Sequence, residues 1–163
     1  MMLSGPYLDE IRARWEAVRD IAVEIATGSD GHAKLLAGHA ASQVELCVTR
    51  DGDPASDGDV LFIGHAFLDI ARLLEVVESG SLLSGEDAVA IGLRIASASP
   101  GLWTAFIESE GGIGGCDVIR VNEGDCEADM YLWMGSDLAP SAIFRFVAEA
   151  RQDVPALLAA TRQ

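Results

Sequence analysis

The chain contains FIGHAFLDIARLL at Phe62–Leu74 and FVAEARQDVPALL at Phe146–Leu158, and the two stretches align without a gap. They share a leading phenylalanine, an alanine, an aspartate and a closing pair of leucines. Their apolar residues recur at the three- and four-residue steps that are typical of a half-buried helix. Similarity of this kind within one chain indicates an internal repeat. We therefore expect a first, degenerate repeat over residues 1–82 and a second over residues 83–163.

Upstream of Phe62, the pattern predicts a helix that Gly28–Gly31 ends, a short apolar run, and a strand in which Val44, Leu46 and Val48 alternate with Glu45 and Cys47. A loop rich in Gly, Pro and Asp then leads to a second helix. The expected ranges are 7–27 for the first helix, 33–37 for the run, 43–49 for the strand, 50–59 for the loop and 60–77 for the second helix.

The second half begins after the boundary at Gly80–Gly85, where Ser84 is expected to cap a helix that Ser99-Pro100-Gly101 ends. Three strands follow, with a flexible turn at Gly111–Gly115, and then two helices. We expect Asp153 to be the N-cap of the last helix, with Pro155 in its first turn. The expected ranges are 87–98 for the first helix, 103–108, 117–121 and 130–134 for the strands, and 140–150 for the next helix.

Each half is thus expected to consist of a helix, short antiparallel strands and a bent helix. A unit of this size is too small to bury its own sheet face well, whereas two units side by side could share one core. The predicted fold is an α+β unit of two tandem pseudo-symmetric repeats.

The charge of the chain excludes several classes of function. It has 26 acidic and 11 basic residues, for a net charge of -15, and Lys34 is its only lysine. Direct nucleic-acid binding needs clustered Lys and Arg, and a polybasic membrane anchor needs them too. Neither partner is expected. There is no signal peptide and no apolar run long enough for a membrane span, so we expect a cytoplasmic protein.

The three cysteines, Cys47, Cys116 and Cys126, are odd in number and widely spaced. This favours free thiols, with Cys47 as a small buried apolar side chain, although Cys116 and Cys126 could meet across a hairpin.

The second half contains ASASPGLW at Ala96–Trp103, then Thr104–Glu108, and the Phe146–Leu158 stretch. Together these resemble a family of small lambdoid-phage early accessory proteins and uncharacterised bacterial proteins. Its members carry an Ala-Thr-Pro-Gly-Pro-Trp turn and a Phe-Ile-Ala-x-Ala-Arg-x-Asp-Val-Pro-x-Leu-Leu helix. The resemblance covers residues 86–160, with Leu102 in place of the second proline, and implies a fold rather than a reaction. In this turn, Trp103 is expected to anchor the core.

Sites for chemistry are not evident from the residues. His32, His39 and His65 lie in no zinc-binding pattern, and the aspartates of residues 51–59 miss required positions of a calcium-binding loop. Glycines 111–115 match no phosphate-binding loop, and the sequence holds no nucleophile motif. We expect no catalytic residues, no metal and no cofactor, although a carboxylate pair acting as acid and base stays an open third alternative.

The acidic residues concentrate in two segments, one in each half. These residues and two neighbouring aromatics are the candidate partner-binding set: Glu108, Glu110, Asp117, Glu123, Asp125, Glu127, Asp129, Tyr131, Trp133, Asp51, Asp53, Asp57 and Asp59. Such a surface suits a basic partner. There are two alternatives: the acids could serve solubility alone, and the two aromatics could lie in the core of the sheet. The leading hypothesis is a non-enzymatic inhibitor that masks the basic cleft of a toxin or defence effector, as toxin-immunity and phage anti-defence proteins do.

The alternative is a small-ligand binding protein with a nucleotide-like ligand in a pocket between the repeats. Tyr131, Trp133 and Trp103 would then stack on the ligand, and Arg120 or Arg145 would contact its anionic group.

Overall fold

The structure, a computed structural model, describes residues 2–39, 41–111 and 114–162. Its elements are α1 (Gly5–Glu16), β1 (Ala22–Thr27), β2 (Ala33–His39), β3 (Ser42–Arg50), β4 (Asp53–Pro54), α2 (Asp57–Ser79), α3 (Gly85–Ser97), β5 (Leu102–Phe106), β6 (Val118–Glu123), β7 (Cys126–Met134), β8 (Asp137–Leu138) and α4 (Ser141–Ala160). These four helices and one eight-stranded antiparallel sheet confirm the α+β class. None of the helices in the described ranges is long and apolar enough to span a membrane.

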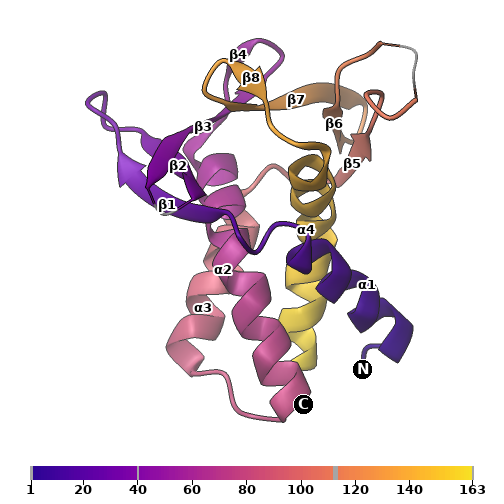
Figure 1. Cartoon of the computed structure of the whole chain (residues 1–163). Helices are drawn as coiled ribbons and strands as arrows, with labels where there is room; N and C mark the ends of the chain where they lie inside the picture. The colour runs from indigo at the N-terminus through magenta and orange to yellow at the C-terminus, as the bar shows by residue number, and fades with distance from the viewer. Residues whose placement is uncertain (1, 40, 112–113, 163) are drawn as a thin grey trace.

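One sheet runs across both halves of the chain (Figure 1). Its strand order is β1-β2-β3-β7-β6-β5, with β4 paired to β3 and β8 paired to β7. The halves join where β3 pairs with β7, from Leu46 opposite Met134 to Arg50 opposite Met130. This register decides which residues of the first half lie beside which residues of the second.

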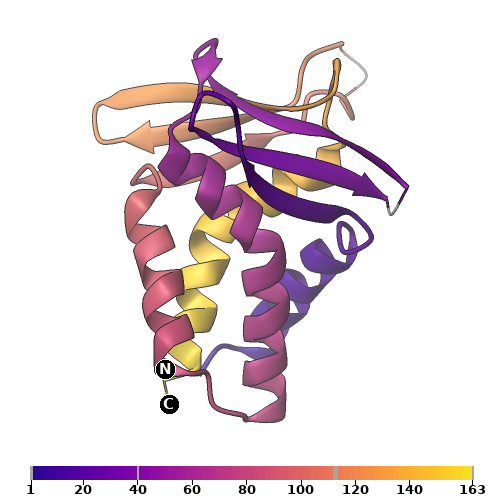
Figure 2. The same ribbon diagram turned by 90° about the vertical axis from the view of Figure 1, so that its left-hand side faces the viewer.

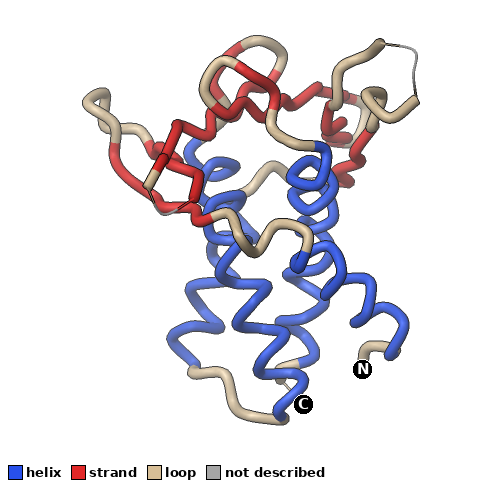
Figure 3. Tube along the Cα trace, viewed as in Figure 1, coloured by secondary structure: helices blue, strands red, loops and turns tan. Residues whose placement is uncertain are grey.

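The helices all lie on one face of the sheet (Figure 3). Helices α2 and α4 pack against each other, with the ring centroids of Phe67 and Phe146 4.7 Å apart, and α1 and α3 each contact both of them. Figure 2 shows the long helices running away from the sheet. The hydrophobic core is continuous and takes buried residues from both halves, among them Leu35, Ile63 and Ile119.

The opposite face of the sheet carries no helix (Figure 1). Side chains alternate between the two faces along a strand, and in β7 the alternation is clear. Ala128, Met130 and Leu132 point toward the helices and are buried. The side chains of β7 on the uncovered face are those of Glu127, Asp129, Tyr131 and Trp133.

The helix expected over residues 7–27 is wrong in its second part. Helix α1 ends at Glu16, and Ala22–Thr27 forms the edge strand β1, paired with β2. The apolar run at 33–37 belongs to β2. In β1 the side chains at Val23 and Ile25 are partly buried and alternate with the exposed Ala22 and Glu24. The apolar residues of this short segment fit both the helical and the strand period, and the pairing with β2 stabilises the strand.

The expected cap at Asp153 is also wrong. Helix α4 runs without a break from Ser141 to Ala160 and contains Pro155. Asp153 is buried in the middle of it and accepts hydrogen bonds from the Tyr7 hydroxyl (2.9 Å) and the Arg14 guanidinium. A proline within a helix removes one backbone donor, and a helix packed on several neighbours can tolerate that loss.

Two expectations for the segment from Ser84 to Trp103 are confirmed. Ser84 caps α3 by accepting the Asp87 N–H, and Trp103 is buried, its Nε1–H donating to the Ser99 carbonyl (3.2 Å). Gly101 has φ +92°, and a Cβ there would lie 1.7 Å from the Asn122 carbonyl oxygen. Of the turn expected at residues 111–115, residues 112 and 113 lie outside the described ranges.

Candidate functional site

The acidic segments of the two halves meet at one corner of the sheet. The Asp51 N–H donates to the Asp129 carbonyl, and the Asp129 N–H donates to Asp51 Oδ1, both at 2.9 Å. We define the acidic corner as the six acids at this end of β3, β6 and β7: Asp51, Asp53, Glu123, Asp125, Glu127 and Asp129. The pairing of β3 with β7 therefore joins residues that are 78 positions apart in the chain.

Two arginines contact the acidic corner. Arg50 Nη1 lies 3.2 Å from Glu123 Oε1, and Arg120 Nε donates to Asp129 Oδ1 at 3.0 Å. The hydrogen bond with Asp129 raises the pKa of Arg120. Six carboxylates against two guanidinium groups give the corner a net charge of −4 when all are ionised. Asp51, Asp53, Asp125 and Glu127 are exposed, so most of this charge faces solvent.

An aromatic strip lies beside the acidic corner on the uncovered face. It consists of Tyr131 and Trp133, which are half-buried, with ring centroids 6.4 Å apart and an interplanar angle of 36°. Tyr131 lies opposite Thr49 and Trp133 opposite Cys47 on β3. On the same sheet, the Arg120 guanidinium lies 5.2 Å from the centroid of the Phe106 ring. Both aromatics of the strip stay accessible to a partner, because no helix covers this face.

Two of the expected surface acids are buried, which is a correction to the candidate set. Asp59, fully buried, accepts from the Ser99 N–H (2.6 Å) and the Ser99 hydroxyl (2.7 Å). Asp117 accepts from the Ser109 N–H (3.0 Å) and the Ser141 hydroxyl (2.7 Å). Burial disfavours ionisation of Asp117, but these hydrogen bonds outweigh it and lower its pKa. Both carboxylates hold neighbouring chain segments together.

The remaining acids of the set lie away from the corner. Glu110 pairs with Arg145 at 2.6 Å, and Glu108 lies in the same loop between β5 and β6. Asp57 is the first residue of α2, where it accepts from the Ala33 N–H (3.1 Å) and lies 3.3 Å from His32 Nδ1. Asp57 belongs to a separate cavity.

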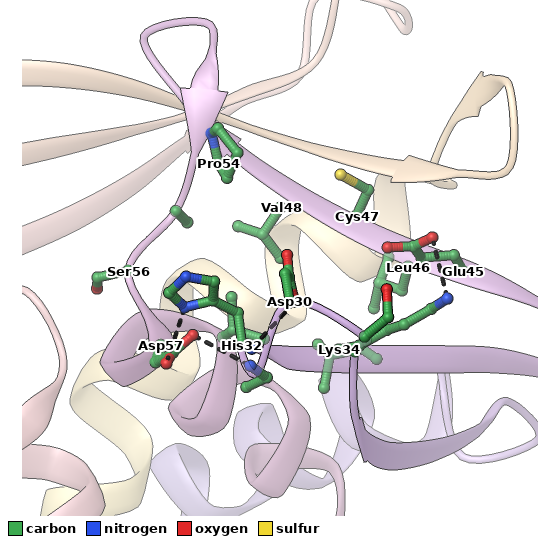
Figure 4. A pocket seen from close by; sticks show the side chains of 16 residues that line it. Asp30, His32, Lys34, Glu45, Leu46, Cys47, Val48, Pro54, Ser56 and Asp57 are labelled. Carbon is green, nitrogen blue, oxygen red and sulfur yellow. Dashed lines mark hydrogen bonds and ion pairs between the residues drawn. The ribbon is translucent and has the colours of Figure 1, made fainter.

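This cavity, of about 660 Å³, opens where β2 and β3 separate (Figure 4). Their pairing ends with Leu35 opposite Leu46, because β3 pairs with β4 from Thr49 onward. Its apolar floor consists of Leu35, Leu46, Val48 and Val60, and its polar rim of Asp30, His32, Lys34, Glu45 and Asp57. Cys47 also lines it, and burial raises the pKa of the Cys47 thiol. Cys47 is half-buried rather than fully buried.

The residues expected to form a pocket between the halves are engaged elsewhere. Trp103 is buried in the core, while Arg120 and Arg145 pair with Asp129 and Glu110. Among the described residues, no group of three or more His, Cys, Asp or Glu could hold a metal ion. Cys116 and Cys126 are exposed free thiols.

Two buried ion pairs were not found by sequence reasoning. Arg94 of α3 donates to Asp69 of α2 at 2.7 Å, and Arg14 of α1 donates to Asp153 of α4 at 2.9 Å. Burial raises the pKa of both aspartates, against the opposing effect of the arginines. The sequence signal for these pairs is the alignment of Asp69 with Asp153. An acid on the apolar face of a helix is buried, and a buried charge needs a partner of opposite charge.

Comparisons of the chain with protein-family models, with curated proteins and with solved structures find no match.

Proposed function

We propose that the protein is a non-enzymatic binding protein that neutralises a basic partner protein by covering its positively charged cleft. The observation that carries this proposal is the acidic corner itself, where acids from distant parts of the chain gather at one place. Most of its carboxylates are exposed and unpaired with arginine. Opposite potentials accelerate the encounter of two proteins and reject partners of the wrong charge.

The aromatic strip supplies the second part of the proposed interface. Tyr131 and Trp133 present flat, half-buried rings beside the carboxylates, and aromatic residues frequently provide most of the binding energy at interfaces. A partner arginine can stack on such a ring while its guanidinium pairs with a neighbouring acid, in the way that Arg120 contacts both Phe106 and Asp129. A cytoplasmic toxin or a defence effector with a phosphate-binding cleft has the required chemistry.

The experiment that tests this proposal is affinity purification from the native host at low salt. We expect a basic protein in a stoichiometric complex that dissociates as the salt concentration rises, because exposed charges are screened. The triple variant Asp53→Asn, Asp125→Asn, Glu127→Gln and the single variant Trp133→Ala should each weaken the complex.

The matched control is Glu10→Gln, Glu16→Gln, Asp20→Asn, which removes the same charge from exposed positions in and just after α1. Equal weakening by both triple variants would mean that the total charge of the protein, and not the acidic corner, determines binding. Recovery of no basic protein at low salt would refute the proposal.

We also propose that the two halves are copies of one structural plan, related to the phage and bacterial family that residues 86–160 resemble. The order α1-β1-β2-β3-β4-α2 recurs as α3-β5-β6-β7-β8-α4. The aligned Asp69 and Asp153 each pair with an arginine on the helix that opens the other half. A tandem arrangement explains why each half supplies a helix to its neighbour.

A further inference from the structure

The cavity between β2 and β3 is independent of the acidic corner and is built differently. Its floor consists of core side chains that are almost fully buried: Leu35, Leu46, Val48 and Val60. Polar side chains surround the mouth, as Figure 4 shows. A pocket with an apolar interior and a few placed polar groups is the usual form of a small-molecule site, and about 660 Å³ is a typical size.

The corresponding place in the second half contains larger side chains. The fourth residue of α2 is Val60, whereas the fourth residue of α4 is Phe144, which is fully buried. The seventh residue of β3 is Val48, whereas that of β7 is Leu132, and both are buried. The volume in the first half thus coincides with smaller side chains at matching positions of the same element order.

The rim of the cavity favours a cation. Three carboxylates, those of Asp30, Glu45 and Asp57, lie there with one lysine. Lys34 Nζ is 3.6 Å from Glu45 Oε2, so this base is already associated with one of the acids. Asp30 and Asp57 have no arginine or lysine contact in the described structure. An anionic ligand at the same place would be repelled by both.

Asp57 is the best-oriented acceptor on the rim. The Ala33 N–H and the His32 ring fix its two oxygens, and its side chain stays about half exposed toward the cavity mouth (47%). A carboxylate held in place by neighbouring donors loses little freedom when it accepts a further hydrogen bond from an ammonium group. The first turn of a helix would otherwise attract an anion, but here Ser56 caps α2 and Asp57 already supplies negative charge.

We propose that this cavity binds a small organic amine, with its apolar body against the Leu35–Val60 floor and its ammonium group on Asp57. Glu45 and Asp30 add to the negative potential at the mouth. Because the ligand needs both an apolar body and a positive charge, neither a simple inorganic cation nor a neutral or anionic analogue of the same shape meets both requirements.

The experiment uses the full chain, isotope-labelled for NMR, with benzylamine as the probe and benzoate, benzyl alcohol and methylamine as matched comparisons at physiological salt. We expect saturable shifts of the amide signals of Ala33, Lys34 and Asp57 with benzylamine, with a Kd on the order of 1 mM. Benzoate should bind at least about tenfold more weakly, as should benzyl alcohol and methylamine.

Two variants test the two parts of the site. Val60→Phe places in the first half the side chain that the second half has at Phe144, and it should abolish binding by filling the floor. Asp57→Asn keeps an oxygen for the Ala33 N–H but removes the charge, and it should weaken benzylamine at least about tenfold. Asp137→Asn, an exposed change on β8, is the control for net charge and should leave the affinity unchanged.

Retained amide dispersion confirms that each variant is folded, and if Val60→Phe fails to fold, Asp57→Asn decides alone. No saturable shift up to about 20 mM benzylamine would overturn the proposal. Equal binding of benzoate, or undiminished binding of benzylamine by folded Val60→Phe or by Asp57→Asn, would overturn it as well. None of these results depends on the basic partner, so the two proposals fail separately.

Discussion

The two halves of the molecule have the same order of elements, yet the start of α2 in the first half lies beside a cavity, whereas the start of α4 in the second half carries the fully buried Phe144. In the first half a short β1–β2 connection and small side chains leave space beside the start of α2. In the second half Phe144, the fourth residue of α4, is fully buried, and Asp117, the residue before β6, accepts a hydrogen bond from the Ser141 hydroxyl at the start of α4. The same order of elements thus places side chains of different volume at the start of its last helix, and in a close-packed interior such differences in volume decide where space is left.

The same contrast holds for the acids. Asp117 in the second half is buried and bonds to the first residue of α4. Asp57 in the first half is the first residue of α2 and bonds back to Ala33, the first residue of β2. In each half one carboxylate links a strand to a helix, but it comes from the helix in the first half and from the residue before the strand in the second, and only the first-half carboxylate stays exposed to solvent.

The largest expected effect comes from truncating Phe144, the fully buried side chain near the start of α4. Phe144→Ala should reduce the free energy of unfolding by about 3–5 kcal/mol, because it leaves a cavity in a rigid core. Val60→Ala, beside space that already exists, should cost about 1 kcal/mol. Urea unfolding followed by circular dichroism measures both. Equal losses would mean that the starts of α2 and α4 are packed alike.

Breaking the two buried ion pairs should also cost more stability in the second half than in the first. Asp153→Ala leaves both Arg14 and Tyr7 without their partner and should cost about 3 kcal/mol. Asp69→Ala affects Arg94 alone at a more exposed site, where the aspartate side chain is 12% rather than 2% exposed, and should cost about 1–2 kcal/mol. Denaturant midpoints at constant slope measure the difference. A larger loss for Asp69→Ala would reverse the comparison.

The smallest effect is a dependence of the unfolding free energy on alkaline pH, to which Tyr7 of the first helix contributes. Burial, together with the hydrogen bond to Asp153, raises the pKa of Tyr7 from 10.0 to about 12. The folded protein therefore holds this proton more tightly than the unfolded chain does, so the resulting stability is complete below pH 10 and is lost as the pH rises toward 12.

The comparison that isolates this effect is Tyr7→Phe, which lacks the titrating group. The difference in unfolding free energy between wild type and Tyr7→Phe should shrink between pH 10 and pH 12. A difference that is constant across this range would show that Tyr7 titrates normally. Cys47, whose pKa is also raised, contributes equally to both proteins and cancels.

The sequence predicted the elements whose apolar pattern is long. Helices α2 and α3 and strands β3 and β7 lie where periodicity placed them, to within a few residues at their ends, and Ser84 and Trp103 have the expected roles. Strand β1 is missed by the pattern because Ala22 and Ile25 also continue the three- and four-residue steps of the preceding helix, so that this six-residue segment fits a helix and a strand equally well. The pattern misassigns Asp153 because an aspartate followed two residues later by a proline, here Pro155, is also typical of a helix start.

By itself, the sequence determined the α+β composition, the amphipathic helices, the net charge of -15 and the lack of a recognisable catalytic motif. Only the tertiary structure decided which carboxylates reach a surface together. Asp51 and Asp129 became neighbours through the register of β3 on β7, while Asp59 was buried by the turn at Ser99. The physical reason is that net charge is a sum over the residues and can be read from the sequence. The exposure of each carboxylate depends on long-range packing, which no local pattern encodes.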